Sequence, residues 1–258
     1  MQELVDVLIF GGQSNMQGET EGIPANNAPV ENALEYRYLT DSLVPLQHPV
    51  GEDLEDGQLW AADKGAGSLL PDFCRTYTEL TGRKVVAIHA ARGDTCVRQW
   101  LKKTTRYACA LKKIKAGIQK AGQLGKIGNI FYIWLQGESD AIYFTSADSY
   151  IQSLTAYKND LKQDAGIHKF GIIEVGYFCS IVDWMTNRSH QEAVACDEEI
   201  MEAQERITRE DDDFVLLTQI CKKLSRDPEY LNPYAQGHYN NKAMAVIGTE
   251  AAKTLAAL

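Results

Sequence analysis

A serine follows directly on a run of apolar residues near the start of the chain. Segment 4–10 is rich in Val, Ile and Leu, and two glycines and a glutamine separate it from Ser14. A near-continuous Val/Ile/Leu run predicts a buried parallel strand, and paired glycines let the backbone turn sharply where it leaves a sheet. Open α/β folds place their chemistry at the carboxyl ends of such strands. Ser14 is therefore a candidate nucleophile.

A serine hydroxyl is a weak nucleophile unless a base removes its proton, so the five histidines are the next candidates. His238 lies in a polar loop after the last predicted strand and directly before the C-terminal predicted helix. In a parallel sheet this loop lies at the same edge as Ser14, so we predict that His238 is the general base. His89, at the end of the second predicted strand, is the alternative base, and a purely structural histidine remains open.

A serine–histidine pair works better when a carboxylate holds the imidazole in the correct tautomer. The position three residues before His238 is Ala235, which cannot do this. Glu138 and Asp140 directly follow the third predicted strand, and Asp140 better fits a helix cap. We therefore predict Glu138 as the acid, with Asp227 as the more distant alternative.

A tetrahedral intermediate needs hydrogen-bond donors aimed at its oxyanion. The backbone N–H of Ser14, at a predicted helix start, is one such donor. Gly93 follows the second predicted strand and Gln136 follows the third, so we predict a hole built from Ser14, Gly93 and Gln136. The residues that flank these positions are predicted to contact substrate: Gln13, Asn15 and Asp94.

Five β-rich runs alternate with helix-like stretches along the chain. The runs cover residues 4–10, 84–89, 130–135, 170–175 and 213–218, and the helical patterns cover 68–81, 95–122, 146–164, 190–209 and 240–258. Alternating strands and helices predict a five-stranded parallel sheet covered on both faces, here in one domain over residues 1–258. The irregular stretch 20–63 is expected to form part of the rim around Ser14.

Composition and motifs exclude several classes of function. A formal net charge of −9 and a pI near 5.1 argue against nucleic acid or an anionic membrane as partners. The glycines near Ser14 match neither dinucleotide nor P-loop patterns, and neither the six cysteines nor the histidines show metal-ligand spacing, so we expect no metal or cofactor. The N-terminus lacks a signal-peptide pattern. A cytoplasmic protein is expected, or a secreted one whose signal is absent from this sequence; the oligomeric state is not indicated.

Four segments resemble the conserved blocks of the SGNH/GDSL hydrolase superfamily, in the branch of sialate O-acetylesterases and family 6 carbohydrate esterases (acetylxylan esterases). They are Gly12-Gln-Ser-Asn-Met16, Ala91-Arg-Gly-Asp-Thr95, Gln136-Gly-Glu-Ser-Asp140 and Gly237-His-Tyr-Asn240. The resemblance implies a flavodoxin-like three-layer α/β/α sandwich and a metal-independent serine esterase. By position, it implies that Ser14 is the nucleophile, His238 the base, Gly93 and Gln136 the oxyanion donors, and Glu138 the triad acid.

Two positions depart from the pattern of many relatives. Ala235 stands where they carry the aspartate of Asp-x-x-His, and Asp94 replaces the second glycine of the second block. The first departure leaves Glu138 as the acid, or leaves a serine–histidine dyad with reduced activity. The second brings a carboxylate near the acyl site.

The expected function is removal of O-acetyl groups from carbohydrate, either acetylated xylan or oligosaccharide or sialic acid, through an acetyl-serine intermediate. A lipase- or thioesterase-like enzyme for longer acyl chains is one alternative, and a catalytically weak carbohydrate-binding homologue is another. Four aromatic residues are candidate platforms for sugar rings: Trp100, Tyr143, Tyr177 and Trp184.

Overall fold

The computed structural model describes residues 4–19, 25–63 and 66–258. In chain order the elements are β1 (Leu4–Gly12), α1 (Ser14–Gln17), β2 (Ala33–Arg37), β3 (Ser42–Pro45), α2 (Leu70–Thr81), β4 (Lys84–Ala91), η1 (Val97–Trp100), α3 (Thr105–Ala121), β5 (Lys126–Leu135), α4 (Glu138–Ile142), α5 (Ala147–Ala165), β6 (Lys169–Ile173), η2 (Asp183–Met185), α6 (His190–Glu210), β7 (Phe214–Thr218), α7 (Cys221–Leu224), η3 (Pro228–Tyr230) and α8 (Asn241–Ala256).

The strands form one sheet in the order β3-β2-β4-β1-β5-β6-β7, parallel throughout except for the antiparallel pair β2–β3. The predicted α/β class is confirmed, but the predicted number of five strands is wrong. The two additional strands, β2 and β3, lie in the stretch expected to be irregular, of which residues 20–24 are outside the described part. Both are short, and β3 is an edge strand whose residues are partly or fully exposed, so they lack the apolar run that marks a buried strand.

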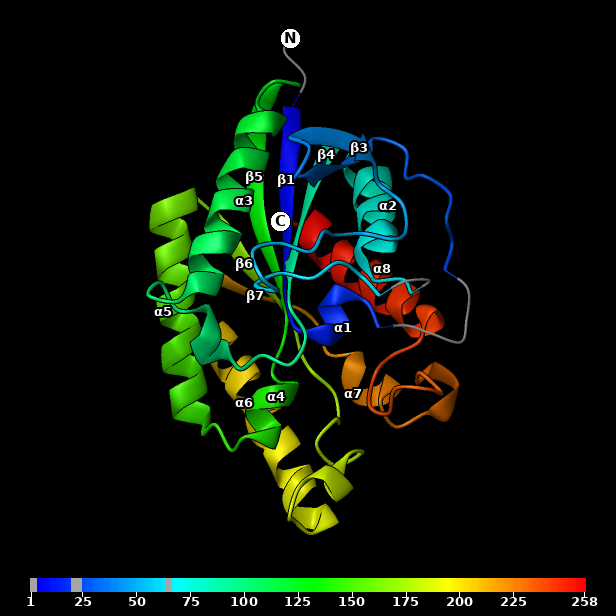
Figure 1. Ribbon diagram of the computed structural model, residues 1–258, viewed down its shortest axis with the longest axis vertical. Coiled ribbons are helices and arrows are strands. Elements are labelled where there is room, and N and C mark those ends of the chain that lie inside the picture. Colours follow the sequence, from blue (N-terminus) through cyan, green and yellow to red (C-terminus); the bar gives the residue numbers. More distant parts are fainter. Residues whose placement is uncertain (1–3, 20–24, 64–65) are drawn as a thin grey trace.

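Helices cover both faces of this sheet (Figure 1). Helices α3, α5 and α6 lie on one side, and α2 and α8 pack together on the other. Apolar residues on α8 recur four positions apart, at Ala243, Ile247, Ala251 and Leu255, and all four are buried. No helix among the described residues is long and apolar enough to cross a membrane.

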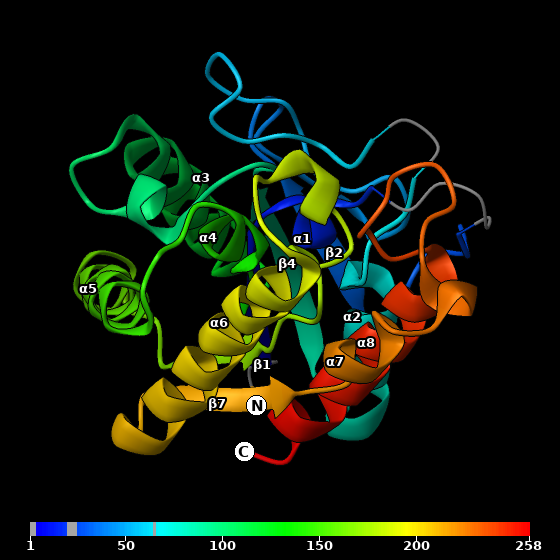
Figure 2. The same cartoon turned by 90° about the horizontal axis from the view of Figure 1, so that it is seen from below.

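Three short helices, α1, α4 and α7, gather at the end of the sheet where the strands β1, β5 and β7 finish (Figures 1 and 2). The turn from β1 into α1 requires Gly12, which has φ 143°. A Cβ at this position would lie 2.0 Å from the Leu135 carbonyl oxygen, at the end of the neighbouring strand β5. The close approach of β1 and β5 therefore fixes where α1 begins, and with it the position of Ser14.

Candidate active site

Ser14 and His238, which are 224 residues apart in the sequence, meet at the carboxyl edge of the sheet. The Ser14 Oγ lies 2.8 Å from His238 Nε2. Ser14 is the first residue of α1, and His238 lies in the loop between η3 and α8. Both line a cavity of about 260 Å³. The pair has the geometry that proton transfer from a serine nucleophile requires.

Contacts on both sides hold the His238 loop in place. The backbone N–H of Asn232 donates to the His238 carbonyl at 2.7 Å, and the His238 N–H donates to the Ala235 carbonyl at 3.1 Å. The Phe178 ring meets the imidazole edge-on, with centroids 5.2 Å apart. Burial lowers the pKa of His238, so the imidazole is neutral at pH 7 and Nε2 can accept a proton.

Among the described residues, no carboxylate accepts a hydrogen bond from His238 Nδ1. His238 Nδ1 is buried and has no hydrogen-bond partner among the described residues. The backbone carbonyls of Ala235 and Gln236 partly offset the lowering of the His238 pKa. The His238 imidazole therefore has only neutral backbone acceptors near it on the side where many relatives carry an aspartate, and none of them is within hydrogen-bond distance of Nδ1.

Glu138 does not make the contact with His238 that we expected of a triad acid. Its Oε1 accepts a 2.8 Å hydrogen bond from Asn15, and its Oε2 has no hydrogen-bond partner among the described residues. Asn15 Oδ1 in turn accepts from the backbone N–H of Tyr239. Complete burial raises the pKa of Glu138 to about 7. Among the described residues, Glu138 reaches the histidine loop through Asn15.

The other two candidates for acid and base lie elsewhere. Asp227 is exposed and accepts from the Glu229 N–H at the start of η3. His89 is buried, and its Nε2 lies 3.1 Å from the Gln17 carbonyl oxygen. Burial lowers the pKa of His89 to about 3. His89 therefore supports α1 from below instead of facing Ser14.

Two of the three predicted oxyanion donors lie beside the nucleophile. The N–H of Ser14 has no intrahelical acceptor because it opens a helix. A Cβ added at Gly93 would lie 3.5 Å from Ser14 Cβ, so this glycine abuts the serine. The Gly93 N–H donates to Gln17 Oε1 at 2.8 Å.

Gln136, the third predicted donor, is used inside the protein. Its side-chain N–H groups donate to the Thr95 carbonyl at 2.8 Å and to Asp140 Oδ2 at 2.5 Å. The residue is fully buried and does not line the cavity. Asp140 also accepts from the Val97 N–H. Gln136 and Asp140 thus tie together the segments that follow β4 and β5, which corrects the expected role of Gln136.

Gln13 and Asp94 line the cavity, as expected for substrate contacts, whereas Asn15 lies beneath it. Gln13 Oε1 accepts from the Ser139 N–H at 3.1 Å, which fixes the amide and leaves its N–H groups for the pocket. Asp94 is exposed with φ 53°. Aspartate tolerates this left-handed conformation better than most residues, which explains how it replaces the glycine of many relatives.

Sequence reasoning missed Glu19, whose Oε2 lies 3.2 Å from His238 Nε2. A Cβ at Gly93 would lie 3.3 Å from Glu19 Oε1, so the carboxylate sits between the base and Gly93. The remaining cavity residues that were not predicted are Ser139, Ile142, Phe178, Val182, Met185 and Gln236. Phe178 follows β6 at the carboxyl edge of the sheet, and this position after a strand could have identified it from the sequence as a cavity residue. Glu19 lies in a loop that has no motif.

Of the predicted sugar platforms, Trp100 and Tyr177 are buried. Trp184 and Tyr143 are exposed, and the Trp184 indole N–H donates to Gln236 Oε1 at 2.9 Å, at the cavity.

Comparison with known proteins decides the family. The model of the family described as "Carbohydrate esterase, sialic acid-specific acetylesterase" matches residues 4–255. The chain belongs to this family. It is a carbohydrate esterase, and therefore a carboxylic ester hydrolase.

Relatives of this esterase are distant in sequence. A probable carbohydrate esterase of Arabidopsis thaliana is 22% identical over 184 residues, which are 66% of this chain and 67% of that protein. A solved structure of an Arabidopsis thaliana protein has a TM-score of 0.69 at 17% identity and covers 96% of both chains. A carbohydrate acetylesterase from Xanthomonas citri has a TM-score of 0.58 at 14% identity, covering 96% of this chain and 55% of that one. These structures share the fold of the esterase.

Proposed function

We propose that the chain is an O-acetylesterase that removes acetyl groups from carbohydrate through an acetyl-serine intermediate. The observation that carries the proposal is the 2.8 Å contact between Ser14 Oγ and His238 Nε2, at the wall of a cavity of only about 260 Å³. A cavity of this size suits an acetyl group better than a long acyl chain. The family supports carbohydrate as the alcohol part of the ester.

The proposed reaction begins when His238 Nε2 takes the hydroxyl proton of Ser14 as Oγ bonds to the acetyl carbon. The backbone N–H of Ser14, the side-chain amide of Gln13 and the Gly93 N–H, which exchanges Gln17 Oε1 for the oxyanion, stabilise the negative charge. Gln13 takes the role that we first gave to Gln136. The ester C–O bond then breaks, and His238 returns the proton to the sugar oxygen. Water repeats the sequence on the acetyl-serine and releases acetate.

The 2.8 Å contact between Ser14 and His238 favours an enzyme over a non-catalytic binding protein. The absence of a carboxylate at His238 Nδ1, among the described residues, favours a slow enzyme. The tautomer with hydrogen on Nδ1 is the one that leaves Nε2 free to accept a proton. The carbonyls of Ala235 and Gln236 partly offset the lowering of the His238 pKa, although a neutral acceptor stabilises the imidazolium less than a carboxylate does.

Acetate release from acetylated xylan, acetylated mannan and O-acetylated sialic acid tests the proposal. Replacing the nucleophile, Ser14→Ala, should reduce kcat/KM by about 10³-fold or more. The matched control is Ser139→Ala, which removes the other serine of the cavity and should keep the rate within about tenfold. Equal rates for Ser14→Ala and the wild type would reject Ser14 as the nucleophile. Faster cleavage of p-nitrophenyl octanoate than of p-nitrophenyl acetate would favour the long-chain alternative.

A further inference from the structure

A buried asparagine, Asn232, lies inside the loop that carries His238. Its exposed fraction is 3%. Leu231 and Tyr239 pair as an antiparallel bridge at the two ends of this loop, and Asn232 is the next residue after Leu231. The loop therefore leaves the core and returns to it at one point, and Asn232 lies where it can contact both of its ends.

Asn232 makes hydrogen bonds with its side chain and with its main chain. Its Oδ1 accepts from the backbone N–H groups of Tyr234 at 2.9 Å and Ala235 at 3.2 Å. Its own backbone N–H donates to the His238 carbonyl at 2.7 Å. Its Nδ2 donates to the Glu19 carbonyl at 2.7 Å. The side chain therefore joins the loop of the base to the segment that follows α1, the helix of the nucleophile.

The local sequence explains the turn at Asn232. Pro233 has a fixed φ and no backbone N–H, so the asparagine side chain accepts from the two residues that follow the proline. The Ala235 carbonyl in turn accepts from the His238 N–H at 3.1 Å. Asn232 therefore fixes the main chain of His238 on both sides, because it bonds the His238 carbonyl directly and the His238 N–H through Ala235.

The position of the imidazole depends strongly on this main chain. His238 Nδ1 has no hydrogen-bond partner among the described residues, so no carboxylate at that atom restrains the ring. Proton transfer from Ser14 requires a well-defined geometry, and a displacement of about 1 Å can lower a rate by about 10²-fold. A residue that fixes the loop therefore affects the rate, although Asn232 itself does not line the cavity.

We infer that Asn232 is the positioning residue of the base: it holds His238 against Ser14 and supplies the restraint that a carboxylate at Nδ1 supplies in a complete triad. The inference rests on the proposed function and adds to it a residue outside the cavity.

Hydrolysis of p-nitrophenyl acetate tests the inference, because this small ester reports on the base without sugar contacts. Asn232→Ala should lower kcat by about 10²-fold and change KM by less than about threefold, since the residue does not line the cavity. Asn232→Ser should lower kcat by only about tenfold, because a serine hydroxyl can still accept from the turn. Should Asn232→Ala fail to fold, Asn232→Ser decides, and a wild-type kcat in that variant would contradict the inference.

Tyr77→Phe is the matched control, because it also removes a buried hydrogen-bond donor. Tyr77 Oη donates to the Asp6 carboxylate at 2.7 Å, near the start of β1 and at the opposite end of this strand from Ser14. The variant should lower the temperature of thermal unfolding and keep kcat within about twofold of the wild type. A kcat of folded Asn232→Ala within about threefold of the wild type, or an equal loss in Tyr77→Phe, would overturn the inference.

Titration of the imidazole gives a readout that needs no turnover. In the Ser14→Ala protein, NMR follows the His238 signal, which is assigned by its loss in Ser14→Ala/His238→Gln. Burial has the largest effect on the His238 pKa and lowers it, while the carboxylates of Glu19 and Asp63 favour the imidazolium. Release of the loop by Asn232→Ala should therefore raise the His238 pKa toward its ordinary value.

This titration separates the inference from the proposed function. An unchanged His238 pKa in Ser14→Ala/Asn232→Ala would show that Asn232 does not position the base. If the wild type instead releases no acetate from any carbohydrate, the proposed function fails, while the two pKa values still judge the role of Asn232.

Discussion

At the scale of single residues, the carboxylate of Glu19 is the unexpected neighbour of the base. At 3.2 Å from Nε2 it favours the imidazolium form of His238. Glu19→Gln should therefore lower the pKa of His238 further, and shift the acidic limb of kcat/KM for p-nitrophenyl acetate down by about half a pH unit or more.

The control for Glu19→Gln is Asp94→Asn, which removes an exposed carboxylate from the same cavity. Its effect on the acidic limb should be smaller, because water screens the charge. A shift to higher pH in Glu19→Gln, or equal shifts in both variants, would show that Glu19 does not act on His238.

Glu138 is predicted to lower the free energy of unfolding at neutral and basic pH. Its folded-state pKa of about 7 lies above the ordinary value of 4.5, so the neutral form favours folding below pH 4.5 and this contribution is lost as the pH rises through 7. Glu138→Gln keeps an acceptor for Asn15 without the charge. Urea unfolding should show the variant gaining up to about 3 kcal/mol on the wild type between pH 4.5 and 8.

The effect of Glu138→Gln on turnover separates two roles of this residue. With no contact to His238, the variant should keep kcat within about tenfold of the wild type, far above Ser14→Ala. A loss as large as that of Ser14→Ala would identify Glu138 as the triad acid in spite of its position.

At the scale of elements, Asp197 of α6 fastens the segment that follows β6. It accepts from the backbone N–H groups of Phe178, Cys179 and Ser180 at 2.8 to 3.2 Å. Asp197→Ala leaves these buried donors unpaired, so it should destabilise the fold by about 2–4 kcal/mol and lower kcat/KM, since Phe178 packs on His238. Thermal unfolding measures the loss of stability, and steady-state kinetics measures the change in kcat/KM. Glu198→Ala, which removes one bond to a tyrosine hydroxyl, should have a smaller effect on each.

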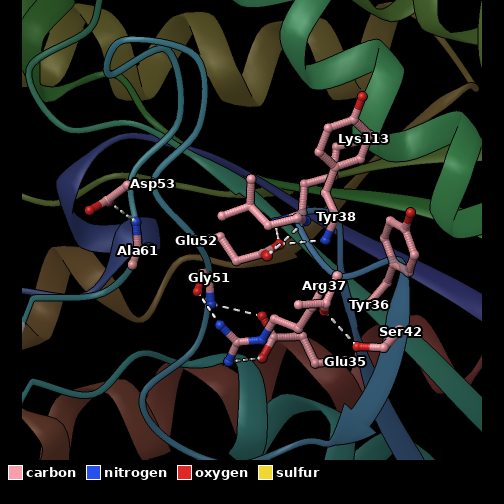
Figure 3. A network of polar contacts seen from close by, with 12 residues as sticks. Glu35, Tyr36, Arg37, Tyr38, Ser42, Gly51, Glu52, Asp53, Ala61 and Lys113 are labelled. Carbon is pink, nitrogen blue, oxygen red and sulfur yellow. Dashed lines mark hydrogen bonds and ion pairs between the residues drawn. The ribbon is translucent and has the colours of Figure 1, made fainter.

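At the scale of the whole molecule, the charges around Lys113 join helix α3 to the segment beside the active site. Lys113→Met leaves Glu52 without its 3.2 Å partner (Figure 3), and should destabilise the protein by about 3 kcal/mol. The double variant Lys113→Met/Glu52→Gln should recover part of this loss, because no unpaired charge remains. Urea unfolding of the wild type, Lys113→Met and the double variant measures the free energy of unfolding of each. If the losses of free energy from the two substitutions simply add, Lys113 and Glu52 are not coupled.

Much of this architecture was predictable from periodicity. The five strand runs and the five long helical patterns correspond to elements of the structure, and 95–122 splits into η1 and α3. The hairpin of β2 and β3 was not predictable, because an edge strand needs few apolar residues and alternates too briefly to stand out. Its strand β2 pairs in parallel with β4, and β3 forms the edge of the sheet.

The sequence by itself determined the α/β class and which residues reach the catalytic edge, because strand ends and short motifs are local patterns. It therefore predicted that Ser14 and His238 face the same edge. Only the tertiary structure decided which of them touch. Glu138 and Gln136 have the expected position along the chain, yet their side chains are used by Asn15, Thr95 and Asp140. Glu19 comes from a loop whose path depends on long-range packing, so no local pattern announces it.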